Sequence, residues 1–229
     1  MSFMKTDVSD EKDSVIEKVV ELNMSRGDKQ EIPIDFEAIR DKIVYDEMGN
    51  QIRFGDIYKH QKTIIVFTRH FLCFICKDYV EDLAIVPLEY LQEANVRLVV
   101  IGPAPYKFIK NFRKETGFVG TMYTDPEREL YQLLKLKDKT QHGQLKGSKH
   151  IKQGLFMGIM KSMWRAMQVQ EYQGNVAQQG GAFVIGPGEV IHHAHIEKNA
   201  TDQCPINDLL EEAGVQLVSF PKDTRVMHL

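Results

Sequence analysis

The sequence predicts an α/β protein with a largely parallel β-sheet at its centre. Apolar, β-branched segments of strand length, such as residues 63–67 and 96–102, alternate with segments whose apolar residues recur at helical spacing. A Cys-x-x-Cys motif, Cys73 and Cys76, follows the first of these strands and opens the next helix. This alternation is typical of parallel sheets that carry helices on their faces.

The region before the first central strand predicts an arm and a hairpin. Residues 1–32 are polar and charged apart from one short apolar stripe, so we expect a weakly ordered N-terminal arm. Residues 42–54 hold two alternating segments around Gly49-Asn50, which predicts a β-hairpin. One domain, residues 33–229, is therefore expected to follow the arm.

The segment after the motif predicts further β and α elements. Apolar residues recur at helical spacing from 80 to 91, and Pro87 lies inside this helix and is expected to kink it. Residues 105–116 predict a helix and residues 121–124 a short strand. Asp125-Pro126 predicts the start of another helix, with proline at its first position.

Residues 137–168 interrupt the alternation of strands and helices and indicate an insertion. It is expected to consist of a polar loop and an amphipathic helix over 155–167. The Met- and Trp-rich face of that helix either packs in the core or lines an apolar groove or partner surface. Residues 181–188, 190–196 and 205–213 then predict a strand entering a turn, a returning strand and a helix.

Composition narrows the classes of function. The chain has 229 residues, 43% hydrophobic and 27% charged, which suits one domain with a substantial core. A formal net charge of −3 gives no reason to expect nucleic acid as a partner. No apolar run reaches the roughly eighteen residues that a transmembrane helix needs. Three cysteines without a signal-peptide core indicate a reducing, cytoplasmic or nuclear compartment.

The position of Cys73 favours thiol chemistry. The unpaired N–H groups and the dipole at a helix N-terminus stabilise an anion, and the i, i+3 spacing puts Cys76 on the same helical face. The alternative is half of a zinc site or a pair of buried thiols. A structural zinc needs two more closely spaced ligands, and neither a second CxxC nor an HxxxH follows; the His192–His195 strand is expected to be solvated, so no metal is assigned.

Four blocks in the correct order resemble the peroxiredoxin-like 2 family of AhpC/TSA-type antioxidant proteins, and the likeness is closest to its C-type branch. It covers about residues 40–229. The blocks are Phe67-Thr68-Arg69-His70-Phe71-Leu72-Cys73-Phe74-Ile75-Cys76-Lys77, Thr124-Asp125-Pro126-Glu127-Arg128-Glu129-Leu130-Tyr131, Met163-Trp164-Arg165-Ala166 and Ala177-Gln178-Gln179-Gly180-Gly181.

This resemblance implies a thioredoxin-like fold and thiol redox activity, with Cys73 as an exposed nucleophile and Cys76 as its resolving partner. No bound cofactor is implied; a thioredoxin or glutathione system, with NADPH as the ultimate donor, would supply electrons. The expected partners are a small peroxide or a protein disulfide as substrate and a dithiol protein as reductant. A sister branch reduces a prostaglandin endoperoxide, which makes a lipid endoperoxide a candidate substrate. The alternative function is a non-catalytic redox sensor or signalling adaptor.

The chain departs from ordinary peroxiredoxins at two places. Their PxxxTxxC motif is absent, because Val66 stands where the proline and His70 where the threonine is expected. Gly180 replaces the arginine that precedes Gly181, and it also stands where thioredoxins carry a cis-proline. Two-thiol exchange is therefore favoured over ordinary peroxidase chemistry.

Several residues are candidates for supporting the two thiols. Arg69, four residues before Cys73, is expected to stabilise the thiolate or an oxygen leaving group, the alternative being a surface ion pair. His70 or Lys77 is expected to assist. Cys204 is either a lone structural thiol or a second resolving cysteine. The substrate-side candidates are His70, Phe74, Gly180, Gly181 and Trp164.

Overall fold

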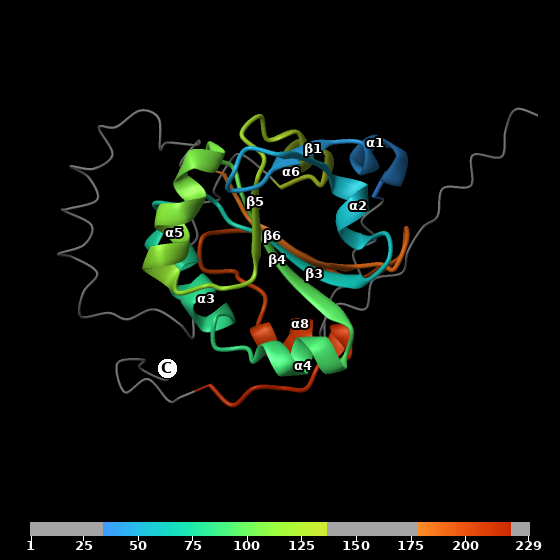
Figure 1. The fold of residues 1–229 in the computed structure, drawn as a ribbon, viewed down its shortest axis with the longest axis vertical. Helices are drawn as coiled ribbons and strands as arrows, with labels where there is room; N and C mark the ends of the chain where they lie inside the picture. Colours follow the sequence, from blue (N-terminus) through green and yellow to red (C-terminus); the bar gives the residue numbers. More distant parts are fainter. Residues whose placement is uncertain (1–33, 137–177, 221–229) are drawn as a thin grey trace, which may run out of the picture.

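A seven-stranded mixed sheet forms the centre of the computed structural model, which describes residues 34–136 and 178–220 (Figure 1). The strand order is β2-β1-β5-β4-β3-β6-β7, with β3, β4 and β5 parallel and the outer pairs antiparallel. The strands are β1 (Ile43–Tyr45), β2 (Gln51–Arg53), β3 (Lys62–Phe67), β4 (Val96–Gly102), β5 (Thr121–Thr124), β6 (Gly181–Ile185) and β7 (Ile191–Ile196).

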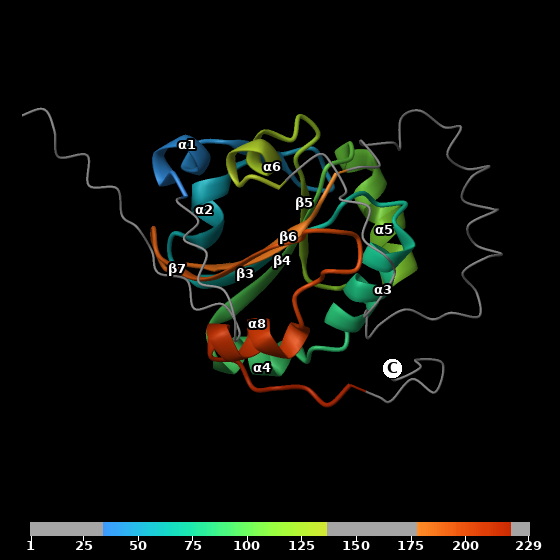
Figure 2. The same cartoon turned by 180° about the vertical axis from the view of Figure 1, so that it is seen from behind.

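Helices cover both faces of the sheet, as the front and back views show (Figure 1, Figure 2). They are α1 (Phe36–Arg40), α2 (Phe54–Tyr58), α3 (Phe74–Leu83), α4 (Leu88–Glu93), the 3-10 turn η1 (Tyr106–Phe108), α5 (Ile109–Thr116), α6 (Glu129–Leu133) and α8 (Ile206–Ala213). Among these helices of the described ranges, none is both long and apolar enough to cross a bilayer.

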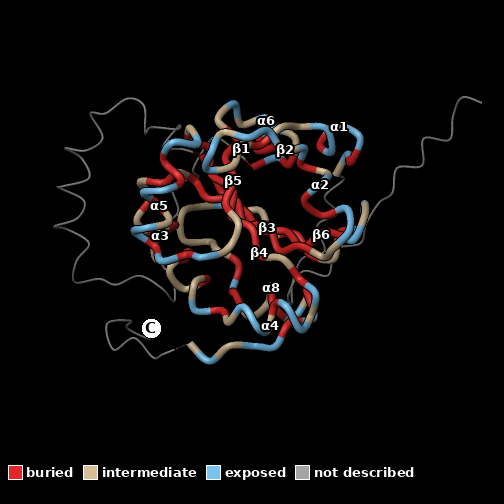
Figure 3. Tube along the Cα trace, in the orientation of Figure 1, coloured by how far each residue is buried: buried red, intermediate tan, exposed pale blue. Residues whose placement is uncertain are grey.

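The alternation of apolar side chains in the central strands explains the layers. In β3, Ile64 and Val66 pack in one core cluster with α3, α4, α5 and α8, whereas Ile65 and Phe67 pack in a second cluster with α1, α2 and α6. Successive side chains of a strand point to opposite faces, so a strand that is apolar throughout needs cover on both sides. The buried centre of the sheet is visible in Figure 3.

The structure confirms the predicted α/β class and most of its elements. The 42–54 hairpin is present as β1 and β2, and the strands over 63–67, 96–102 and 121–124 lie within one residue of their predicted bounds. Gly117 ends α5 in the left-handed conformation, with a φ of 69°. The arm over 1–32 and the insertion over 137–168 lie outside the described residues.

Two local predictions were wrong, and two short helices were not predicted. Pro87 does not kink one helix but separates α3 from α4, because it caps α4 in an extended conformation. The helix expected at Pro126 begins at Glu129, since the Asp125 carboxylate accepts the N–H groups of Glu129 and Leu130 at 3.2 and 2.9 Å. The one-turn helices α1 and α2 were not predicted, being too short to show helical periodicity.

Candidate active site

The link that carries the two cysteines begins at Phe67, in the middle of the sheet. Strand β3 pairs with β4 on one side and β6 on the other, so the chain leaves the sheet between two neighbours. The Thr68 N–H donates to the Ile101 carbonyl at 2.9 Å, and the Tyr131 hydroxyl donates to the Thr68 carbonyl at 2.7 Å. These bonds fix the start of the link to β4 and α6.

Phe71 anchors the rest of the link. Its ring stacks on Phe112 of α5 with 4.3 Å between ring centroids and an interplanar angle of 20°. Gly102 makes room for it, because a Cβ there would lie 2.2 Å from a ring carbon of Phe71. Cys73 follows two residues later, so the packed Phe71 ring fixes the position of the chain just before Cys73.

Cys73 is the N-cap of α3, which confirms the predicted position of the motif at a helix start. Its sulfur accepts the Cys76 N–H at 3.4 Å. The expectation of an exposed nucleophile was wrong: Cys73 is 4% and Cys76 2% exposed, and Ile75 packs with both. The chain neighbours Leu72 and Phe74 are half-buried.

The pKa values of the two thiols are shifted in opposite directions. A hydrogen bond from the Cys76 thiol, together with the Arg69 charge and the N–H groups of Cys76 and Ile75, lowers the pKa of Cys73 to about 7 against the effect of burial. Burial and the neighbouring Cys73 raise the pKa of Cys76 well above its ordinary value. At neutral pH the pair therefore combines a Cys73 that is about half ionised with a protonated Cys76.

Arg69 lies where the sequence predicted a cation. Its Nη1 donates to the Cys73 sulfur at 3.9 Å, and its Nε donates to the Gln178 carbonyl at 2.8 Å. The side chain is buried, at 8% exposure, so the alternative of a surface ion pair is wrong. The Gln178 side chain is held in turn, because its Nε2 donates to the Leu136 carbonyl at 2.9 Å. A buried, fixed guanidinium thus faces the sulfur at the helix N-terminus.

Glu197 is a buried acid that the sequence analysis missed. It follows β7 directly, is 6% exposed, and its Oε2 accepts the Gly180 N–H at 3.1 Å. Burial raises its pKa well above the ordinary value; the Cys73 charge raises it further, and the Arg69 charge lowers it. Only the pairing of β6 with β7 brings it near the motif, so the sequence held no local signal beyond an acid at the end of a strand.

The remaining candidates in the 70–77 segment take different positions. His70 is half-buried, and burial with the Arg69 charge lowers its pKa to about 4, so its ring is neutral at neutral pH. Lys77 forms an ion pair with Glu115 of α5 instead of assisting Cys73. Phe74 packs against the cluster of Cys73, Ile75 and Cys76.

The later candidates are only partly brought to the site. Gly180 and Gly181 are buried beside it, with Gly181 paired to Phe67 in the sheet and Gly180 bonded to Glu197. They support the site from within rather than line an open substrate surface. Trp164 lies outside the described residues.

Cys204 and the histidine strand form a separate buried contact. The Cys204 sulfur lies 3.4 Å from Nε2 of His193, and both side chains are buried, so the expectation that this strand is solvated was wrong for His193. Burial raises the pKa of the Cys204 thiol and lowers that of His193, which leaves both groups neutral. Within residues 34–136 and 178–220, no group of three or more His, Cys, Asp or Glu side chains is placed to hold a metal ion.

Comparison with known proteins identifies the family. The family described as AhpC/TSA antioxidant enzyme matches residues 85–199. Peroxiredoxin-like 2C of Homo sapiens is 43% identical over 194 residues, which cover 84% of this chain and 86% of the relative. The chain belongs to the peroxiredoxin-like 2 family. The resemblance drawn from four sequence blocks is thereby confirmed.

Proteins of lower sequence identity are also similar to this peroxiredoxin-like 2 chain. Prostamide/prostaglandin F synthase of Bos taurus is 23% identical over 178 residues, covering 76% of this chain and 85% of the relative. The crystal structure of peroxidoxin BcpB from Mycobacterium tuberculosis superposes with a TM-score of 0.54 at 12% identity, covering 79% of this chain and 95% of that chain. This likeness confirms the thioredoxin-like fold, and family membership supports an antioxidant role of the peroxiredoxin type.

Proposed function

We propose that this protein is a thiol oxidoreductase in which Cys73 is the nucleophile and Cys76 the resolving thiol. The observation that carries the proposal is the placement of two sulfurs at one helix N-terminus, with the Arg69 guanidinium 3.9 Å from Cys73. These surroundings lower the pKa of Cys73 and raise that of Cys76. A nucleophilic thiol reacts as its thiolate, whereas a resolving thiol must stay protonated until the first step is complete.

With hydrogen peroxide or an organic hydroperoxide, the Cys73 thiolate attacks one oxygen and the O–O bond breaks. The sulfur is oxidised to a sulfenic acid, and the leaving alkoxide or hydroxide takes up a proton. The Cys76 sulfur then attacks Cys73, loses its proton, and displaces the sulfenic oxygen as water. With an endoperoxide, the first step gives a sulfenate ester and an alkoxide that takes up a proton, and Cys76 then displaces the second oxygen as an alcohol. A Cys73–Cys76 disulfide results in each case. With a disulfide substrate the first step gives a mixed disulfide and releases a thiolate, and the second step releases the other thiolate.

Arg69 has a defined task in this scheme. Its guanidinium stabilises the Cys73 thiolate before attack and the anionic oxygen or sulfur that leaves. We assign His70, three residues before Cys73 and neutral at neutral pH, as a hydrogen-bond partner for the leaving group in this proposal. Because no cofactor is needed, electrons return from an external dithiol protein of a thioredoxin or glutathione system, supplied ultimately by NADPH.

The substrate class is a peroxide or a disulfide. The likeness to a prostamide/prostaglandin F synthase supports a lipid endoperoxide as one candidate, and the apolar Phe74 beside Cys73 suits an apolar substrate. The absence of the PxxxTxxC motif supports two-thiol exchange as the step common to all candidates.

The test is turnover of hydrogen peroxide, an organic hydroperoxide, a lipid endoperoxide and a small disulfide with NADPH, thioredoxin reductase and thioredoxin. We expect turnover of at least one substrate, loss of turnover in Cys73→Ser, and an adduct trapped on Cys73 in Cys76→Ser. Turnover in none of these assays, together with a Cys73 alkylation profile centred near the unperturbed value of about 8.5, would overturn the proposal and favour the redox sensor or adaptor.

A further inference from the structure

The two thiols of the site are buried, and a surface loop lies beside them. Cys73 and Cys76 are almost fully covered. In the proposed function a substrate atom must reach the Cys73 sulfur, so part of the cover has to move. The loop between β7 and α8, residues 197–205, runs beside α3 in both views of the molecule (Figure 1, Figure 2).

Residues 198–203 of this loop form a strap across the first turn of α3. The Ala200 side chain packs against the cluster that contains both cysteines and Ile75. The Gln203 Nε2 donates to the Ile75 carbonyl at 3.5 Å, which is long for a hydrogen bond. The strap residues are themselves exposed or half-buried. A methyl contact and one long hydrogen bond are interactions that a small rearrangement breaks.

Both ends of the strap are fixed to the rest of the protein. Before it, the buried Glu197 accepts the Gly180 N–H on Oε2 at 3.1 Å, and its own N–H donates to the Gly180 carbonyl at 3.2 Å. After it, the buried Cys204 accepts the Tyr79 hydroxyl on its carbonyl at 2.6 Å. The strap can therefore lift while the sheet and α8 stay in place.

The strap is folded as one turn, and His195 of β7 holds that turn. The Lys198 N–H donates to Asp202 Oδ2 at 2.9 Å, and the Thr201 N–H donates to Asn199 Oδ1 at 3.0 Å. The His195 ring donates from Nε2 to the Asp202 carbonyl at 2.7 Å and lies 3.8 Å from Asp202 Oδ1. The local bonds keep the turn intact when it moves, whereas the His195 bond ties it to the sheet.

We infer that the strap is an access gate of the thiol pair, which closes over the pair through Ala200, is held by the His195–Asp202 hydrogen bond, and lifts to admit substrate. The inference rests on the proposed two-thiol function, because it concerns the route of substrate to Cys73. Ala200 limits the size of the molecule that reaches the sulfur. His195 is a positioning residue that does not touch substrate. Opening is a local equilibrium, so the rate of Cys73 modification follows the population of the open form.

The first test is the labelling rate of Cys73 in the reduced native protein, followed by peptide mapping on the plateau of its pH profile. The reagent is iodoacetamide. His195→Leu should label about fivefold faster than wild type, the effect of one hydrogen bond lost from the closed form. The pH of half-maximal labelling should stay as in wild type, which separates access to the sulfur from its acidity.

His192→Leu is the matched control. His192 also belongs to β7, is also half-buried, and its Nε2 donates to the Gly186 carbonyl at 2.7 Å, at the turn between β6 and β7. This variant loses an equivalent hydrogen bond away from the strap and should keep the wild-type labelling rate.

A bulky reagent tests the role of Ala200. Ala200→Gly removes the methyl group from the contact with the thiol cluster. The labelling rate of Cys73 with a polyethylene-glycol maleimide should therefore rise by a larger factor than the rate with iodoacetamide. Equal factors for the two reagents would show that Ala200 does not limit size.

The second test uses wild type alone. A polyethylene-glycol chain attached to Cys73 leaves no room for the closed strap, so the Lys198 and Asp202 amides should exchange faster with deuterium in the labelled protein. The Glu197 amide, bonded to Gly180, should keep its protection.

Equal iodoacetamide rates in wild type and His195→Leu, or unchanged deuterium uptake over 198–202 after labelling, would overturn the inference. Labelling needs no turnover, so the two proposals fail separately. Faster labelling of His195→Leu without turnover of any substrate would support the strap and count against the proposed function. Turnover together with equal labelling rates would support the proposed function and overturn the strap.

Discussion

Arg69 and Cys73 are four residues apart in the chain, and a single guanidinium bridges the Cys73 sulfur, at 3.9 Å, and the carbonyl of Gln178, at 2.8 Å. The second bond comes from a segment 109 residues further along the chain. The position of the cation therefore depends on the central sheet, where β6 lies beside β3. This arrangement predicts that the acidity of Cys73 responds to any change that alters the charge or the geometry of Arg69.

The first prediction concerns Arg69→Met. Removal of the charge takes away one of the causes that lower the Cys73 pKa, so the pH of half-maximal alkylation should rise above about 7. A rise of about one unit would lower the thiolate fraction at pH 7 about fivefold. Arg69→Lys should restore only part of the effect, because an ammonium does not reproduce the two-sided guanidinium geometry. Iodoacetamide kinetics measure both, and a profile unchanged in Arg69→Met would contradict the role of the cation.

A second prediction separates the three thiols of the native protein. Cys73 ionises as pH rises through about 7, so its alkylation rate should reach half its plateau there. Burial raises the pKa values of Cys76 and Cys204, which should stay unlabelled until the protein unfolds. Peptide mapping after a short pulse of reagent gives the three rates. Earlier labelling of Cys204 than of Cys73 would show that the assignment of the reactive thiol is wrong.

Local sequence signals predicted the part of the site that lies on one continuous segment. A β-branched run followed by Cys73-x-x-Cys76 is sufficient to place a thiol at a helix start, and Arg69 lies in the same link. The near-continuous apolar runs of β3 and β4, which alternate with helical segments, were similarly sufficient to predict a sheet covered on both faces. These features depend on residues a few positions apart.

Features that depend on contacts between segments far apart in the sequence were not predicted. Glu197 reaches the motif only because Ile196 pairs with Gly181, which brings the end of β7 beside the start of β6. The burial of Cys73 depends on tertiary packing, which the spacing of residues in the sequence does not predict. The break at Pro87 was expected as a kink, since proline in a helical pattern allows either outcome and tertiary packing selects one.

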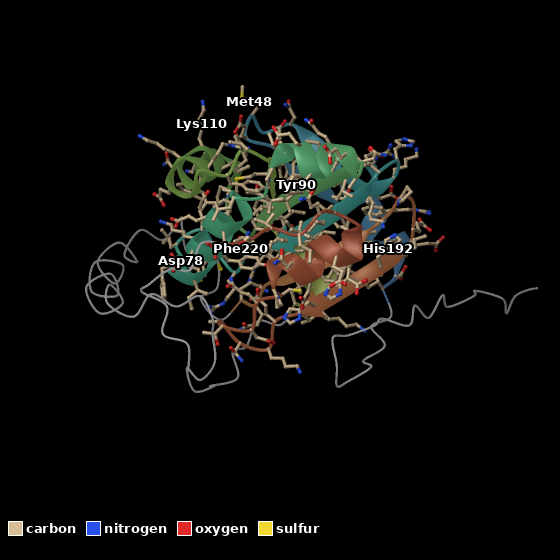
Figure 4. All side chains as sticks on the ribbon, turned by 90° about the horizontal axis from the view of Figure 1, so that it is seen from below. Met48, Asp78, Tyr90, Lys110, His192 and Phe220 are labelled. Carbon is tan, nitrogen blue, oxygen red and sulfur yellow. The ribbon has the colours of Figure 1, made fainter. Side chains whose placement is uncertain are left out.

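A third prediction concerns the anchor of the link. Phe71→Ala removes the ring that stacks on Phe112, so the free energy of unfolding should fall by about 3 to 5 kcal/mol. Urea denaturation measures the loss. Met48→Ala is the control, because Met48 is 72% exposed and extends from the hairpin to the outside of the molecule (Figure 4), and it should change stability by no more than about 0.5 kcal/mol. Equal losses in the two variants would show that Phe71 does not anchor the link.

The fourth prediction separates Lys77 from the chemistry. Lys77 is one turn after Cys73, but its ammonium pairs with Glu115 of α5 at the surface. Lys77→Met should therefore cost less than about 1 kcal/mol of stability and leave the alkylation profile of Cys73 unchanged. A shift of that profile equal to the one in Arg69→Met would mean that the ammonium, and not only the guanidinium, stabilises the thiolate.

The fifth prediction tests the contact that joins the sheet to Glu197. Gly180→Ala would place a Cβ 2.3 Å from the Phe67 carbonyl and 3.0 Å from both oxygens of Glu197, and backbone on one side leaves little room to relax. We expect a loss of about 1 to 3 kcal/mol in urea, as for other overpacked sites. Val119→Ala, at a 69% exposed position, is the control and should change stability by no more than about 0.5 kcal/mol. Equal losses in the two variants would show that Phe67 and Glu197 leave room for a side chain at position 180.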